Sequence, residues 1–138
     1  MNVMVRWSLA RRDSEELSFR RVLYAYLHPK TRSVLYIGKA DRCSVRERLG
    51  GQHKRSVAAF LRRLNVSGVY TLVGVLYVER GLRFSSALLS DIESLLIAKV
   101  RPRANIQSIA SRICRPGLKV ICRGVWPIRR RLFIDVAD

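Results

Sequence analysis

Two short runs of apolar and aromatic residues, separated by a polar turn, do most to constrain what this chain can fold into. The first run covers residues 22–26 and the second covers residues 34–40. Runs of this composition on either side of a proline-containing turn predict a β-hairpin. With the turn centred near Lys30, Tyr24 is expected opposite Tyr36, and residues that face each other in a hairpin share one face of the sheet.

The remaining segments show helical and strand-like patterns with recognisable ends. A short helix is expected over residues 45–49, with Ser44 as its N-cap. A second helix is expected over residues 53–64. The continuous apolar run 69–78 predicts a central strand. A stripe of apolar residues at helical spacing predicts a long helix over about 86–100, which a following proline stops.

The length of 138 residues predicts a single domain with one core. We divide it into a core at residues 21–107, an N-terminal extension at 1–20 and a C-terminal extension at 108–138 that reads as a β-hairpin. The expected fold is an α/β sandwich of the α+β kind. Its centre is a small, mainly antiparallel three-stranded sheet, built from the first hairpin and the later apolar strand and flanked by helices.

Arginine gives the chain a strong positive charge. There are 27 Lys and Arg residues against 10 Asp and Glu residues, a net charge of +17, and only five of the basic residues are lysines. The planar guanidinium group suits bidentate contacts with phosphate. A folded domain this basic most often binds nucleic acid. A ribosome-type RNA-binding role and an acidic protein partner are the alternatives that charge alone leaves open.

The cysteines and the hydropathy bear on location. Cys43, Cys114 and Cys122 form no CxxC pair, so we interpret them as reduced thiols and not as a zinc site or a disulfide framework. No apolar run approaches the length of a membrane span, and the N-terminus lacks the apolar region of a secretory signal. We expect a cytoplasmic, nucleoid-associated protein, or a nuclear one if the source is eukaryotic, with no membrane partner.

The motifs of the hairpin resemble those of the GIY-YIG nuclease family. Val22-Leu23-Tyr24 stands where that family has Gly-Ile-Tyr, and Tyr36-Ile37-Gly38 matches the second triplet. An arginine on the next helix, a histidine, a glutamate on a later helix and an asparagine beyond it follow in the family's order. The resemblance covers about residues 21–107. The chain departs from the pattern at Val22, in a longer loop before the arginine and in a shifted histidine.

The resemblance implies a metal site and a hydrolytic centre. It makes Glu93 the sole protein ligand of one divalent ion, Mg²⁺ or Mn²⁺. Tyr24 would activate the attacking water, and the neighbouring Lys39 is placed to lower its pKa from the usual value near 10. Arg48 would stabilise the transition state, with Arg46 as the alternative. The candidate catalytic residues are Tyr24, Tyr36, Lys39, Arg48, His53, Glu93 and Asn105.

Each of these residues also has an ordinary interpretation. A helix glutamate is most often a surface residue, as we expect for Asp91. A pair of strand tyrosines is usually packing, as we expect for Tyr26. His53 would otherwise be a solvated residue at a helix start, and Asn105, which the resemblance uses to orient the glutamate or the strand end, would be a loop cap. Candidate phosphate contacts are Arg42, Arg46, Arg55, Arg101, Arg103 and Arg112.

These inferences together predict a metal-dependent DNA endonuclease that hydrolyses phosphodiester bonds in duplex or branched DNA. A nucleic-acid-binding module on the same scaffold, for DNA or RNA and without cleavage, is the alternative. A homodimer or a partner protein would have to supply any specificity that the C-terminal hairpin does not.

Overall fold

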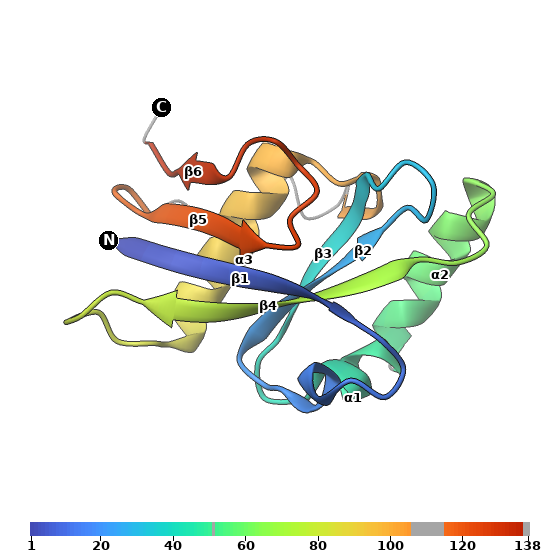
Figure 1. Ribbon diagram of the computed structural model, residues 1–138, viewed down its shortest axis with the longest axis horizontal. Coiled ribbons are helices and arrows are strands. Elements are labelled where there is room, and N and C mark those ends of the chain that lie inside the picture. The colour runs from blue at the N-terminus through green and yellow to red at the C-terminus, as the bar shows by residue number, and fades with distance from the viewer. Residues whose placement is uncertain (51, 106–114, 137–138) are drawn as a thin grey trace.

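The structure is a computed structural model that describes residues 1–50, 52–105 and 115–136. The chain forms six strands, three α-helices and two 3-10 turns in the described residues (Figure 1). In chain order they are β1 (Asn2–Ala10), the 3-10 turn η1 (Glu15–Ser18), β2 (Val22–Leu27), β3 (Val34–Ala40), α1 (Val45–Leu49), α2 (Gln52–Arg63), β4 (Tyr70–Val78), α3 (Ser86–Val100), the 3-10 turn η2 (Arg103–Asn105), β5 (Lys119–Gly124) and β6 (Leu132–Ile134).

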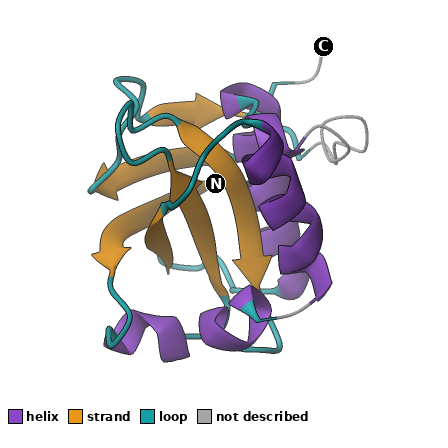
Figure 2. Cartoon of the chain, turned by 90° about the vertical axis from the view of Figure 1, so that its right-hand side faces the viewer, coloured by secondary structure: helices purple, strands orange, loops and turns teal. Residues whose placement is uncertain are grey.

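All of the strands just named belong to one sheet, so the expected three-stranded sheet is wrong. The six strands lie in the order β3-β2-β4-β1-β5-β6, and the sheet is mixed because β1 and β5 run parallel while the other pairs are antiparallel. The sheet curls strongly into a half-barrel, as Figure 2 shows. The fold is therefore α+β with three α-helices in the described residues, and the C-terminal hairpin extends the sheet instead of standing apart from it.

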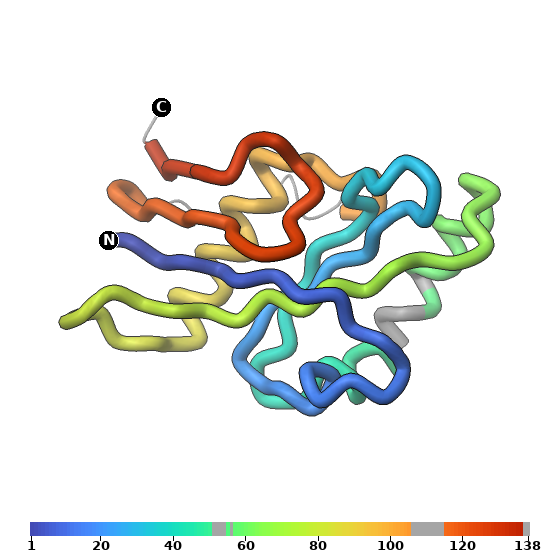
Figure 3. Tube along the Cα trace, viewed as in Figure 1, coloured from blue at the N-terminus to red at the C-terminus, as the bar shows by residue number. Residues whose placement is uncertain are grey.

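The N-terminal segment is the reason for this difference. The alternating side chains of Val3, Val5 and Trp7 are buried, so β1 needs cover and lies inside the sheet between β4 and β5. Its partner β5 lies more than a hundred residues later in the chain, and the Lys119 N–H donates to the Met1 carbonyl at 2.8 Å. Figure 3 shows the two segments running side by side. No local pattern marks a parallel pairing between segments this far apart in sequence.

Two apolar clusters pack on opposite faces of the sheet. Leu88, Leu89 and Ile92 of α3 pack against one face, where Leu23 and Ile37 are fully buried. The side chains of β2 alternate between the two faces, so its tyrosines belong to the second cluster. That cluster also holds residues from α1 and α2. Both α3 and α1 contact the edge strand β3, so side chains from the two helices come near one another at this edge.

Local signals at the helix ends are confirmed. Ser44 caps α1, its hydroxyl accepting from the Glu47 N–H at 3.2 Å, while the Glu47 carboxylate accepts in return from the Ser44 N–H at 3.2 Å. These hydrogen bonds from Ser44 lower the pKa of Glu47. Ser85 caps α3 in the same way through the Leu88 N–H at 3.0 Å. In the described residues, no helix is long and apolar enough to cross a bilayer.

Candidate active site

The register of the β2–β3 hairpin differs from the expected one. Tyr24 lies opposite Gly38, and Tyr36 lies opposite Tyr26, so the predicted pairing of Tyr24 with Tyr36 is wrong. A bulge lies between Tyr26 and Leu27. After it, the His28 N–H donates to the Ser33 carbonyl and closes a loop that is longer than the expected turn. Together these features displace the strands from a hairpin centred on Lys30.

The rings of the three tyrosines nevertheless gather on one face. The Tyr24 ring lies 5.9 Å from that of Tyr36 and 5.9 Å from that of Tyr26, and the Tyr26 and Tyr36 rings stack at 5.6 Å. All three side chains are buried. Tyr26, which we expected to play no part, is therefore as much a member of the cluster as the two motif tyrosines.

Gly38 makes room for the Tyr24 ring. A Cβ atom at Gly38 would lie 2.6 Å from Cζ and 2.7 Å from the hydroxyl oxygen of Tyr24, closer than atoms of a packed interior approach. Only the absence of a side chain lets the phenol cross the edge strand. The glycine that ends the second motif thus has a packing reason that the hairpin pattern alone did not reveal.

A Gly38→Ala substitution tests this contact. Overpacking of this kind costs about 1–3 kcal/mol, so the variant is expected to melt several degrees below the wild-type protein in a thermal scan. Gly68→Ala is the matched control, because nothing lies within 4 Å of a Cβ atom there. Equal melting temperatures for the two variants would contradict the packing role of Gly38.

Tyr24 lies close to Arg48 and Glu93, although the three residues come from β2, α1 and α3. The Arg48 guanidinium is within hydrogen-bonding reach of the Tyr24 hydroxyl, and the Glu93 carboxylate is near enough to act on the phenol electrostatically. The buried Nε of Arg48 has no hydrogen-bond partner among the described residues. The site thus holds a buried donor that a further acceptor would satisfy.

Glu93 is half-buried on α3 and faces two cations. Burial raises the pKa of its carboxyl group above the ordinary value, and the positive charges of Lys39 and Arg48 partly offset that rise. The Lys39 ammonium donates to the Ser90 hydroxyl. Ser90 precedes Glu93 by three residues, so both side chains lie on the same face of the helix. Strand β3 and helix α3 therefore present an ammonium, a hydroxyl and a carboxylate to one another.

The pKa of Tyr24 moves in the direction opposite to the one we expected. Burial raises it to about 12, and the nearby Arg48 guanidinium offsets only part of the increase. Lys39, which we expected to lower this pKa, is engaged with Ser90 instead. The cation that acts on Tyr24 is therefore Arg48, and the described residues alone do not make the phenol a base at neutral pH.

Asn105 holds the edge strand β3 by its backbone. Its Oδ1 accepts from the Ile37 N–H at 2.8 Å, and its Nδ2 donates to the Ile37 carbonyl at 2.9 Å. Asn105 is buried, with 3% of its surface exposed. It thereby supplies the two hydrogen bonds that a further strand would make, and it fixes the backbone between Tyr36 and Gly38. Of our two suggestions for Asn105, this arrangement corresponds to support of the strand.

The structure separates the two candidate arginines of α1. Arg46 is exposed and its Nη1 donates to the Arg12 carbonyl at 3.4 Å, away from the tyrosines, whereas Arg48 lies beside Tyr24 and Glu93. Asp91 is buried and pairs with Arg115, its Oδ2 lying 2.5 Å from the Arg115 Nε. Asp91 therefore has a partner apart from the site.

Two of the predicted residues cannot be placed by their side chains. His53 lies on α2, and its side chain is outside the described part of the chain. Arg112 lies outside the described residues altogether. Of the other candidate phosphate contacts, Arg42 and Arg55 are exposed.

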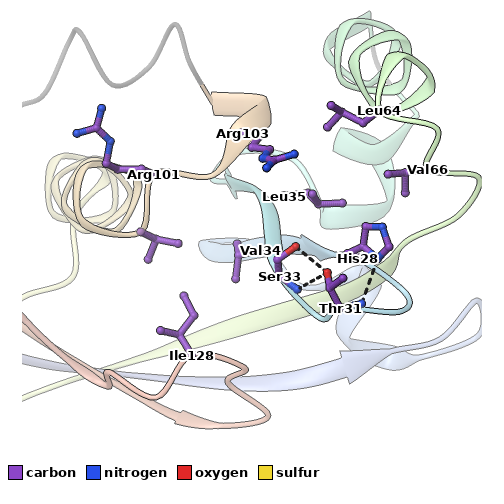
Figure 4. A pocket seen from close by; sticks show the side chains of 11 residues that line it. His28, Thr31, Ser33, Val34, Leu35, Leu64, Val66, Arg101, Arg103 and Ile128 are labelled. Carbon is purple, nitrogen blue, oxygen red and sulfur yellow. Dashed lines mark hydrogen bonds between the residues drawn. The ribbon is translucent and has the colours of Figure 1, made fainter.

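Arg101 and Arg103 line a cavity of about 600 Å³ beside the β2–β3 turn. In Figure 4 the Arg103 side chain points toward the side on which Leu64 lies, whereas Arg101 points the other way. His28 stabilises the turn, because its Nδ1 accepts from the Lys30 and Thr31 N–H groups at 3.0 and 3.2 Å.

The donor set fits one lightly held divalent ion. No group of three His, Cys, Asp or Glu residues that would form a protein-only metal site occurs in the described residues. Mg²⁺ is commonly bound by one or two carboxylates, with waters and substrate phosphates completing its octahedron. Glu93 offers such a carboxylate, and a bound cation would offset the desolvation that raises the pKa of the Glu93 side chain.

Two residues of this arrangement escaped the sequence analysis. Ser90 had a usable signal, because it lies one helical turn before Glu93. The packing role of Gly38 had none, because it depends on the register of the hairpin.

Comparison with known proteins found no matching family, no matching curated protein and no matching solved structure.

Proposed function

We propose that this protein is a metal-dependent DNA endonuclease that hydrolyses phosphodiester bonds. The observation that carries the proposal is the meeting of Tyr24, Arg48 and Glu93 at the β3 edge, from three separate elements. Binding alone does not require a half-buried carboxylate, which repels phosphate. The net charge of +17 supports an anionic polymer as the substrate.

Each residue has a part in the proposed reaction. Glu93 would hold one Mg²⁺ or Mn²⁺ ion, which when bound neutralises charge on the phosphoryl oxygens. Arg48, whose buried Nε lacks a partner among the described residues, would donate to the phosphate as charge develops. Tyr24 would orient the attacking water. A bound cation would lower the pKa of the Tyr24 phenol, so that the phenol releases its own proton to solvent and the resulting phenolate accepts a proton from the attacking water. Lys39 and Ser90 would keep the Glu93 carboxylate in place, and Asn105 would fix the strand.

The direct test is incubation of purified protein with supercoiled plasmid in Mg²⁺ or in EDTA. The expected result is conversion of the plasmid to nicked and linear forms only with Mg²⁺. Recovery of intact plasmid in both conditions, from protein that is folded by its thermal transition, would remove the proposal.

The two arginines of α1 provide a matched pair of variants. Arg48→Lys keeps the charge but loses the fork that reaches Tyr24, and loss of one such donor costs about 10²–10³ in kcat. Arg46→Lys alters an exposed side chain and is expected to leave the nicking rate within about twofold of wild type. Single-turnover nicking rates measure both, and equal rates for the two variants would contradict the assignment of Arg48.

One observation favours a second function, a nucleic-acid-binding module that does not cut. The pKa of Tyr24 is about 12, which disfavours a phenolate at neutral pH. Such a module would bind DNA or RNA equally well in Mg²⁺ and in EDTA, and binding would be unchanged or improved in Glu93→Gln. A preference for RNA without nicking would identify an RNA-binding protein.

A further inference from the structure

A second groove lies where β1 ends and β4 begins. It has a volume of about 560 Å³, within the range of ligand sites. Leu27, the last residue of β2, lines it. Leu27 is three residues beyond Tyr24, about 10 Å along the strand. Its side chain belongs to the cluster under α3, whereas Ala10 and Val69, which also line the groove, pack against the tyrosine cluster. The groove is therefore near the proposed active site but separate from it.

The floor of this groove is apolar and aromatic. Tyr70 is 44% exposed, Val125 is 48% exposed and Leu9 is 40% exposed, and all three line the groove. Three large apolar side chains in one hollow form an exposed patch, and such patches usually bind something. A tyrosine ring with its face accessible is a platform on which any nucleobase can stack.

The rim of the groove is cationic. Arg11, Arg12 and Arg32 line it and are exposed, and no acidic residue is among the side chains that line it. Within the described part of the chain, none of the three guanidinium groups is paired with a carboxylate. A stacking platform surrounded by unpaired guanidinium groups combines the two features with which proteins hold single-stranded nucleic acid.

We propose that this groove binds an unpaired stretch of nucleic acid, with a base stacked on Tyr70 and the flanking phosphates held by Arg11, Arg12 and Arg32. The proposal rests on the proposed function in one respect, because it assigns the nuclease a substrate that carries a single-stranded segment. The occupant follows from the charge. A phosphate backbone complements three exposed arginines that pair with no carboxylate of the described residues, and its bases complement the apolar side chains. A duplex, whose bases are stacked inside, offers nothing to Tyr70.

Binding in EDTA tests the groove without any cleavage. The probes are a fluorescently labelled oligothymidylate, its oligouridylate counterpart and a duplex of equal length, followed by anisotropy. Tyr70→Ala is expected to weaken binding to the single strand by about 5-fold to 100-fold, the loss of one stacked base, and to change duplex binding by less than about twofold. Tyr70→Phe should bind like the wild type, because it keeps the ring.

Tyr77→Ala is the matched control, since Tyr77 is 51% exposed on the same strand but lies outside the groove. Replacing Arg12 by Gln is expected to reduce the slope of log affinity against log salt by about 0.7 for the single strand. The oligothymidylate and oligouridylate arms distinguish DNA from RNA as the source of the unpaired bases, and binding of either that Tyr70→Ala weakens and Tyr77→Ala does not supports the groove.

Three results would overturn the inference. The first is an equal loss of single-strand affinity in Tyr70→Ala and Tyr77→Ala. The second is that polyglutamate displaces the oligonucleotide and its own binding depends on Tyr70 to the same extent. The third is that the protein sediments as a dimer which Tyr70→Ala dissociates. Failure of the groove remains distinguishable from failure of the nuclease. Plasmid nicking in Mg²⁺ together with single-strand binding that does not depend on Tyr70 removes the groove alone, whereas Tyr70-dependent single-strand binding without nicking removes the nuclease alone.

Discussion

A Glu93→Gln protein should nick plasmid DNA about a thousandfold more slowly than the wild type. Charge stabilisation by a bound metal is worth several kcal/mol, and each 1.4 kcal/mol corresponds to about a tenfold rate. Glutamine keeps the size of the side chain but not the negative charge with which Glu93 would hold a divalent ion. Single-turnover nicking at saturating Mg²⁺ measures the effect, and a rate near that of the wild type would remove Glu93 from the reaction.

The same variant separates lost chemistry from lost folding. Burial raises the pKa of Glu93 in the folded chain, so the folded state binds this proton more tightly than the unfolded state does. The carboxyl group therefore costs stability as pH rises from its unfolded pKa of about 4.3 through the raised folded value. Glu93→Gln should match the wild type in acid and exceed its melting temperature at neutral pH.

Two further comparisons complete this experiment. Added Mg²⁺ or Mn²⁺ should raise the melting temperature of the wild type, because an ion that binds only the folded state stabilises it. It should not raise that of Glu93→Gln, which lacks the carboxylate ligand. Glu15→Gln is the control, since Glu15 is an exposed glutamate on η1. A loss of nicking accompanied by a fall in melting temperature at neutral pH would point to a structural role of Glu93.

The elements that the sequence predicted well are those with local causes. The serine caps of α1 and α3 depend on bonds to residues three positions away, at Glu47 and Leu88. Strand β4 and helix α3 begin within a residue or so of where their patterns predict, because apolar periodicity and a stopping proline are contained in the segments themselves.

The sheet could not be predicted in the same way, because its size depends on distant pairings. The parallel contact of β1 with β5 joins the two ends of the chain, and nothing in either segment specifies the other. The hairpin register failed for a smaller reason. The bulge after Tyr26 and the loop closed by His28 and Ser33 shift the strand pairing away from the register of a symmetric turn. Gly38 therefore lies opposite Tyr24.

The candidate site was likewise predicted only in part. Its residue types came from motif order, which the resemblance supplied. The structure brings Arg48 and Glu93 near Tyr24, and it brings Lys39 near Glu93. The partners within the site did not follow from motif order. Lys39 directly follows Gly38 in sequence, yet strand alternation sends it toward Ser90 on α3 while the tyrosines face α1.

Replacement of Asn105 by alanine should destabilise the protein more than any other single substitution considered above. Ile37 is fully buried, and Asn105 satisfies both its N–H and its carbonyl, at 2.8 and 2.9 Å. A buried polar group left without a partner costs about 1–3 kcal/mol, so two of them cost about 2–6 kcal/mol, a large part of the total stability of an ordinary domain. The expected fall in melting temperature is about 8–24 °C.

The chemical nature of this support can be resolved with a second variant. Asn105→Asp keeps an acceptor for the Ile37 N–H, but it faces the Ile37 carbonyl with an oxygen in place of the amide donor. At acidic pH the melting temperature of this variant should lie between those of Asn105→Ala and the wild type. It should decline as the pH rises and the carboxyl group ionises. Asn2→Ala, at an exposed position, is the control and should melt like the wild type. If Asn105→Ala also melts like the wild type, the two hydrogen bonds do not hold β3, and the strand that carries Tyr36, Gly38 and Lys39 must be fixed by its pairing with β2 and by packing.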